Sequence, residues 1–148
     1  MGRVEKSIEI RAPPEKVWEM LAFDRCQEWM NGLKSVEYIS EVRIPKDKYK
    51  VGASAHMIKV EKEKFDFKIT ESLENEKITV RTSPIHGATM TISVILKPTE
   101  IGTEMAYTVD YEMPWGIFGK FLDKLFVRRA LKKDITGETE KLKSILEK

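Results

Sequence analysis

The sequence predicts an α+β fold, in which a curved antiparallel sheet of about seven strands wraps around a long C-terminal helix. Two short helices are expected after the first strand. Apolar and polar residues alternate with a period of two over 3–11 and over most of 34–113, which is typical of strands with one buried face. The strand segments are joined by short turns, so consecutive strands are expected to pair antiparallel. Residues 115–148 follow a helical pattern, and only they are long enough to cover the apolar face of the sheet.

The first strand is expected at residues 3–11, where Val4, Ile8 and Ile10 share one side. Pro14 suits the first turn of a helix, and a second short helix is expected from Asp24, a plausible N-cap, to Met30. Six further strands follow from the alternation, at residues 34–44, 51–61, 64–73, 77–83, 88–97 and 103–113.

Composition restricts the class of protein. The chain has 148 residues, enough for one domain (1–148) with a sizeable core. Its 41% apolar and 34% charged residues exclude a disordered chain, and no run of ~18 apolar residues predicts a membrane span. The single cysteine, Cys26, cannot form an internal disulfide, and no apolar signal core follows the N-terminus. We therefore expect a cytoplasmic protein.

The charges are nearly balanced, with 26 Lys+Arg against 24 Asp+Glu, so we expect no nucleic-acid partner. Residues 120–133 nevertheless hold six basic side chains and one acidic side chain. This cluster is either a solvated helix face or part of a transient membrane or protein contact near residues 115–133.

Several short segments of the sequence are found together in one known protein family. These are residues 8–18 (Ile-Glu-Ile-Arg-Ala-Pro-Pro-Glu-Lys-Val-Trp), then Asp24 and Trp29, Val51-Gly52, residues 102–105 and residues 142–147. In their order and spacing, the chain resembles the START-like or SRPBCC superfamily, and within it the polyketide cyclase/dehydrase-like branch. The resemblance implies the helix-grip fold and an apolar or amphipathic ligand between sheet and helix. Some members of the superfamily are enzymes, and others are protein partners or chaperone cofactors, so the fold alone does not decide function.

A cavity is also expected on physical grounds, because the concave face of a curved sheet is wider than a single helix of ~10 Å diameter. An apolar cavity with a few polar groups is a default ligand site, although the same side chains could simply fill a core. The predicted lining is Trp29, Tyr38, Met57, Phe67, Val80, Met90, Ile92, Tyr107 and Val109, with Trp115, Phe118, Phe121, Leu122 and Leu125 from the helix.

No catalytic or metal-binding constellation is predicted. Cys26 has no histidine nearby in sequence and is expected to be a buried free cysteine. His56 should point away from the cavity if Met57 points inward, and His86 lies in a turn, so neither is expected to bind a metal. Phosphate-binding loops are absent, so no cofactor is expected.

An enzyme would have to use polar side chains that face the cavity. Tyr38, Tyr107 and Tyr111 are candidate hydrogen-bond donors or general acids, and Asp24 with Trp29 could act as an acid beside an aromatic platform. The structural alternative is that the tyrosine rings pack in the core, and that Asp24 and Trp29 cap and anchor the short helices.

The apolar stripe of the C-terminal helix changes direction. At 100° per residue it shifts by roughly 130° between Phe126 and Leu131. We predict that the helix breaks near 127–130 or buries two different surfaces. Residues 131–146 would then pack on the sheet, and residues 115–126 would cover the cavity mouth. The alternative is one helix that is buried nearly all round.

The function predicted from the sequence is binding or transport of a hydrophobic small molecule, such as a lipid, isoprenoid or polyketide-like molecule, by a monomer or dimer. A cyclase or dehydratase that uses the same cavity is the alternative from the enzyme class. A protein-interaction module that exposes apolar surface is the third hypothesis.

Overall fold

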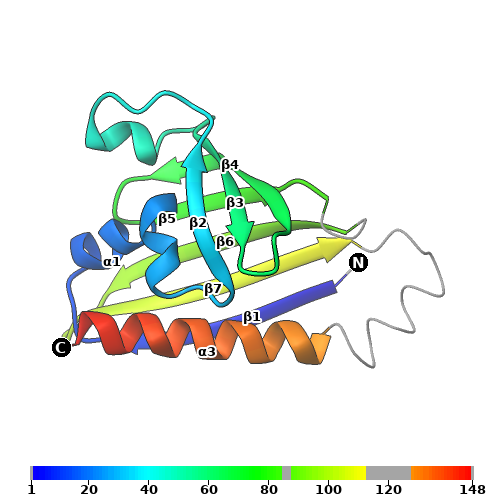
Figure 1. Ribbon diagram of the computed structural model, residues 1–148. Helices are drawn as coiled ribbons and strands as arrows, with labels where there is room; N and C mark the ends of the chain where they lie inside the picture. The colour runs from blue at the N-terminus through cyan, green and yellow to red at the C-terminus, as the bar shows by residue number, and fades with distance from the viewer. Residues whose placement is uncertain (1, 85–87, 113–127, 148) are drawn as a thin grey trace.

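The computed structural model describes residues 2–84, 88–112 and 128–147. A seven-stranded antiparallel sheet runs in the order β1-β7-β6-β5-β4-β3-β2 (Figure 1). The strands are β1 (Gly2–Ile10), β2 (Leu33–Tyr38), β3 (Ser54–Lys59), β4 (Lys64–Leu73), β5 (Lys77–Thr82), β6 (Thr89–Pro98) and β7 (Thr103–Glu112). Strands β2 to β7 form a meander, and β1 closes the order by pairing with β7, from Gly2 opposite Tyr111 to Ile10 opposite Thr103.

The helical segments within the described residues are α1 (Pro14–Met20), the 3-10 helices η1 (Phe23–Glu28) and η2 (Pro45–Lys48), and α3 (Arg128–Leu146). Helix α3 lies along β1, and η1 contacts β2 at the opposite edge of the sheet (Figure 1). The α+β helix-grip fold expected from the sequence is confirmed.

The alternation in the strands directs apolar side chains to the concave face. In β7, Met105, Tyr107, Val109 and Tyr111 are all buried. Directly opposite residues of an antiparallel pair share a face, so the partners of β7 on β6 line the same surface. Ile135 and Leu142 of α3 are also buried. The prediction that residues 131–146 pack on the sheet as core is confirmed. A break near 127–130 and a cover formed by 115–126 cannot be compared with the structure, because 113–127 lie outside the described residues.

The start of β7 is packed closely against the end of β1. A Cβ atom at Gly102 would lie 2.1 Å from the backbone oxygen of Ile10, so this position requires glycine. The next residue, Thr103, is fully buried and donates a hydrogen bond from Oγ1 to the backbone oxygen of Ala12 at 2.7 Å. Gly102 and Thr103 therefore hold the start of β7 against the end of β1.

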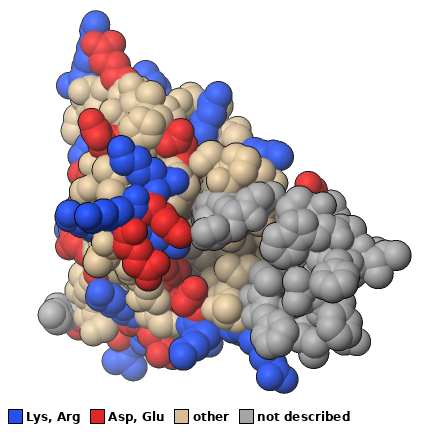
Figure 2. Space-filling view, turned by 45° about the vertical axis from the view of Figure 1, so that its right-hand side comes forward, with Lys and Arg blue, Asp and Glu red and all other residues tan. Residues whose placement is uncertain are grey.

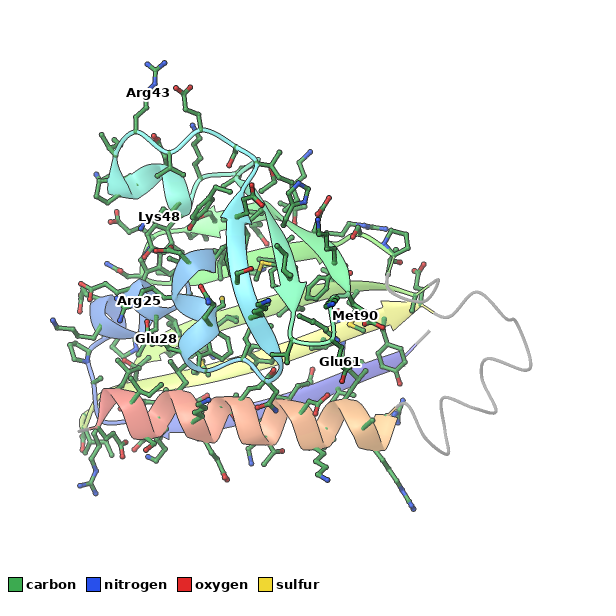
Figure 3. The ribbon with its side chains drawn as sticks, viewed as in Figure 1. Arg25, Glu28, Arg43, Lys48, Glu61 and Met90 are labelled. Atoms are coloured by element: carbon green, nitrogen blue, oxygen red, sulfur yellow. The ribbon has the colours of Figure 1, made fainter. Side chains whose placement is uncertain are left out.

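The segment after β2 differs from the prediction. The strand expected over 34–44 ends at Tyr38, residues 45–48 form η2 instead of a loop, and the next strand begins at Ser54 instead of 51. Pro45 occupies the first turn of η2, where its missing N–H costs nothing, and the Asp47 carboxylate accepts hydrogen bonds from the backbone N–H groups of Arg43 and Ile44. These local bonds replace strand pairing, and Arg43 lies at the tip of a projecting loop (Figure 3).

Candidate ligand cavity

A cavity of about 150 Å³ lies between the concave face of the sheet and α3. A smaller hollow of about 30 Å³ shares Met30, Phe67, Ile92 and Tyr107 with it. Side chains of the connection after η1, of strands β2 to β7 and of α3 surround the larger space. They are Met30, Asn31, Leu33, Lys59, Phe65, Phe67, Thr82, Met90, Ile92, Tyr107, Val109, Leu131, Asp134, Ile135 and Glu138.

The sheet register brings the apolar lining together. Ile92 lies opposite Val109 of β7, and Phe67 lies opposite Thr82 of β5. The backbone N–H of Met90 donates to Thr82 Oγ1 at 3.0 Å, which holds the start of β6. Met90 of β6 and Lys59 of β3 border the cavity from different strands. Met90 and Ile92 are only half-buried, although both point to the concave face, because they border the cavity.

The structure divides the residues that the sequence predicted for the lining. Phe67, Met90, Ile92, Tyr107 and Val109 line the larger cavity, and Trp29 and Val80 line the smaller hollow. Tyr38 and Met57 line neither. Trp115, Phe118, Phe121, Leu122 and Leu125 lie outside the described residues. Ligand contact by any of these side chains stays a prediction.

Tyr38 is held away from the cavity by a polar network. Its hydroxyl donates to Asp24 Oδ1 at 2.8 Å, and Lys48 Nζ lies 3.1 Å from Asp24 Oδ2. Burial alone would raise the pKa of Asp24, but the hydrogen bonds from Tyr38 and Lys48 outweigh burial and lower it. Asp24 lies inside η1, whose N-cap is Ala22, so its predicted capping role is wrong. The network ties η1 to β2 and η2.

Met57 belongs to a filled part of the core. It is completely buried in β3. On one side it lies opposite Val36 of β2, and on the other side it lies opposite Phe65 of β4. Phe65, which the prediction omitted, lines the cavity instead. Both residues have the same inward phase, so the alternation could not distinguish them.

Trp29 has the anchoring role that the structural alternative predicted. Its indole Nε1 donates to the backbone oxygen of Met20 at 2.8 Å. Its ring meets the ring of Tyr107 edge-on, with centroids 6.3 Å apart. The polar edge of the indole is therefore satisfied while its apolar surface borders the smaller hollow.

Glu138 is the polar group of the cavity that the sequence analysis missed. Its residue is only 8% exposed, and its Oε2 accepts a hydrogen bond from the backbone N–H of Asn31 at 3.0 Å. Burial raises the pKa of Glu138 to about 7, and Asp134 adds to this rise, whereas the Asn31 hydrogen bond and Lys59 oppose it. The spacing along the helix could have revealed it, because Glu138 lies three residues after Ile135 and therefore on the same, buried face.

The remaining candidate groups do not form a reactive site in the described part of the chain. Cys26 is buried as predicted, and burial raises the pKa of its thiol, which opposes formation of the thiolate nucleophile. His56 Nδ1 lies 2.6 Å from Asp66 Oδ1, and this pair is on the face opposite to Met57. His86 lies outside the described residues, among which no group of three metal-ligating side chains occurs.

The described part of the basic cluster lies on the exposed surface of the first turns of α3. Arg128, Arg129, Lys132 and Lys133 are exposed, and Lys132 Nζ donates to the backbone oxygen of Glu5. On the face shown in Figure 2, basic and acidic side chains alternate without a large area of one sign. A membrane or protein contact near 115–133 stays a prediction. None of the described helices is long and apolar enough to cross a membrane.

Residues 1–147 match the family model for polyketide cyclase/dehydrase and lipid transport. The chain belongs to this family. The SRPBCC-type resemblance seen in the sequence is thereby confirmed. Among curated proteins, none matches the chain.

Solved structures show the same fold at low identity. MLL2253 from Mesorhizobium loti has a TM-score of 0.74 at 18% identity, covering 98% of this chain and 96% of that chain. Ara h 8.0201 has a TM-score of 0.72 at 11% identity, covering 98% and 97%. DynU16, from the dynemicin biosynthetic locus, has a TM-score of 0.67 at 19% identity, and the match covers 98% of this chain but 47% of DynU16.

Proposed function

We propose that this family member binds a hydrophobic or amphipathic small molecule, such as a lipid, isoprenoid or polyketide-like molecule, in the cavity between sheet and α3. The observation that carries the proposal is the apolar lining, in which Met90 and Ile92 point to the concave face and yet remain half-buried. Such side chains lose water when a ligand enters, which favours binding by about 25 cal/mol per Å² of apolar surface.

The size and composition of the cavity support a compact apolar group. An apolar cavity of about 150 Å³ is large enough for a single aromatic ring. Met30 and Met90 have flexible side chains, so the space can adapt to larger groups by changes of rotamer. The smaller hollow of about 30 Å³ shares Ile92 and Tyr107 with the cavity and adds volume next to it.

A cyclase or dehydratase is the second candidate, because of Glu138. A buried carboxyl group whose pKa is close to neutrality can give or take a proton on the cavity wall. Turnover of a bound polyketide-like substrate that is lost in Glu138→Gln would support this candidate. Binding without turnover supports the carrier.

Calorimetric titration with benzyl alcohol, an uncharged alcohol with a single aromatic ring, tests the proposal. The variant Ile92→Trp fills the cavity, and Ile95→Trp is its matched control, because Ile95 lies on the outer face of the same strand and is exposed. We expect the wild type and Ile95→Trp to bind the alcohol equally, and Ile92→Trp to bind at least about tenfold more weakly. Unchanged binding by a folded Ile92→Trp variant would contradict the proposed location.

A further inference from the structure

The wall of the cavity formed by α3 differs chemically from the wall formed by the sheet. Asp134 and Glu138 lie one helical turn apart on α3 and both border the cavity. Lys59 of β3 faces the same space. A purely apolar ligand would not use any of these charges.

We propose that the cavity selects amphipathic ligands that carry a protonated amine, which Glu138 binds through its carboxylate while the apolar part of the ligand fills the space against the sheet. This inference rests on the proposed function and names the class of ligand.

Glu138 is positioned as a fixed acceptor. The Asn31 backbone N–H holds Oε2 at 3.0 Å, and the residue is 8% exposed, so the carboxylate has little freedom to turn. An ionised carboxylate accepts at both oxygens. Oε2 is used by the protein, and Oε1 remains for a donor on the ligand.

The charge balance of the wall favours a cation. Two carboxylates, Asp134 and Glu138, border the space together with one ammonium group, that of Lys59. Lys59 Nζ also lies 4.0 Å from Glu63 Oε2 and 5.7 Å from the ring centroid of Phe65, so its charge is shared. An anionic head group would meet net repulsion here, whereas an ammonium group would relieve the repulsion between Asp134 and Glu138.

The aromatic lining supports the same conclusion. Phe65, Phe67 and Tyr107 border the cavity, and Phe65 and Phe67 pack edge-on with centroids 5.3 Å apart. Aromatic faces attract organic cations as well as apolar rings. Carboxylate and aromatic side chains together are the chemistry that recognises an arylalkyl amine.

Binding of an amine should be coupled to the proton on Glu138. The charged or titratable groups that act on Glu138 or are influenced by it are Asp134 on α3, Lys59 on β3, Tyr107 on β7 and Cys26 on η1. Burial is the main reason that the pKa of Glu138 is about 7. The amine requires the ionised carboxylate, so its affinity should fall by about tenfold from pH 8 to pH 6.

The test compares two probes that share a single aromatic ring, benzylamine and benzyl alcohol, on the full chain by calorimetry. At pH 8 we expect the amine to bind at least about tenfold more tightly than the alcohol. The variant Glu138→Gln keeps an acceptor for the Asn31 N–H and should remove this preference while changing alcohol binding by less than about twofold.

Glu140→Gln is the matched control, because Glu140 is an exposed carboxylate on the same helix, and it should leave both affinities unchanged. Equal binding of amine and alcohol by the wild type, or an amine preference that survives in Glu138→Gln, would overturn the inference and leave the proposed function standing. Failure of both probes to bind would overturn the inference and count against the proposed function itself.

Discussion

The concave face is built from the same alternating strands throughout, yet the part under η1 retains much less space than the part under α3. We call these two parts the filled half and the hollow half. In the filled half, under η1, Phe23 packs against Phe67 with ring centroids 5.7 Å apart, and a hollow of only about 30 Å³ remains. Met57 of β3 is completely buried. In the hollow half, under α3, a cavity of about 150 Å³ remains between the helix and side chains of strands β2 to β7. The difference lies in the covering element rather than in the strands.

The covering elements differ in what they present to the sheet. η1 buries Phe23 and Cys26, whereas α3 buries Glu138 and Thr139 beside Ile135. Thr139 Oγ1 donates to the backbone oxygen of Ile135 at 2.8 Å, so its polar group is satisfied within the helix. Glu138 instead borders the cavity. The apolar cover, η1, leaves a hollow of about 30 Å³, whereas the mixed cover, α3, leaves a cavity of about 150 Å³ with polar groups on one wall.

The largest expected effect is in the filled half. Phe23→Ala removes a ring that contacts Phe67 and Tyr38, and should lower the free energy of unfolding by about 3–5 kcal/mol. Urea unfolding followed by circular dichroism measures the change. A loss below about 1 kcal/mol would show that this half is not packed as described.

Glu138 should make stability depend on pH. Its folded pKa of about 7 exceeds the usual 4.5, so the folded state binds more protons and stability falls as pH rises from about 4.5 to 7. The free energy of unfolding of Glu138→Gln, relative to that of the wild type, should therefore increase by up to roughly 3 kcal/mol from pH 5 to pH 8. Urea unfolding of both proteins at several pH values measures this change. A difference in free energy of unfolding that does not vary with pH would contradict the burial of the Glu138 carboxylate.

The polar network over the filled half should contribute a smaller amount. Tyr38→Phe removes the hydrogen bond to Asp24 and leaves the ring in place, so we expect a loss of about 1–2 kcal/mol. The pKa of Asp24 should rise, because Tyr38 is one of the groups that lower it. Carboxyl NMR titration measures this shift, and an unchanged pKa would argue against the bond.

The smallest effect is expected at the cavity. Met90→Ala should cost about 1 kcal/mol or less, well below the usual value for a methionine in a filled core, because Met90 is half-buried and already borders empty space. Met57→Ala is the matched comparison from the filled half, with an expected loss of about 2–5 kcal/mol. Equal losses at the two methionines would remove the distinction between the halves.

The sequence by itself determined the antiparallel pairing of the consecutive strands from β2 to β7, the inward face of each strand and the packing of residues 131–146. Alternation with a period of two and short turns leave few other arrangements for a chain of this kind. The same reasoning selected Phe67, Met90, Ile92, Tyr107 and Val109, which do line the cavity.

Only the tertiary structure decided which inward residues border space. Met57 and Met90 have the same phase on their strands, but one lies in the filled half and the other beside α3. Periodicity assigns a side chain to a face and says nothing about the element that covers it. Glu138 was missed for a related reason: an apolar stripe is traced through apolar residues, and a carboxylate on that stripe gains its altered pKa only from the burial that folding imposes.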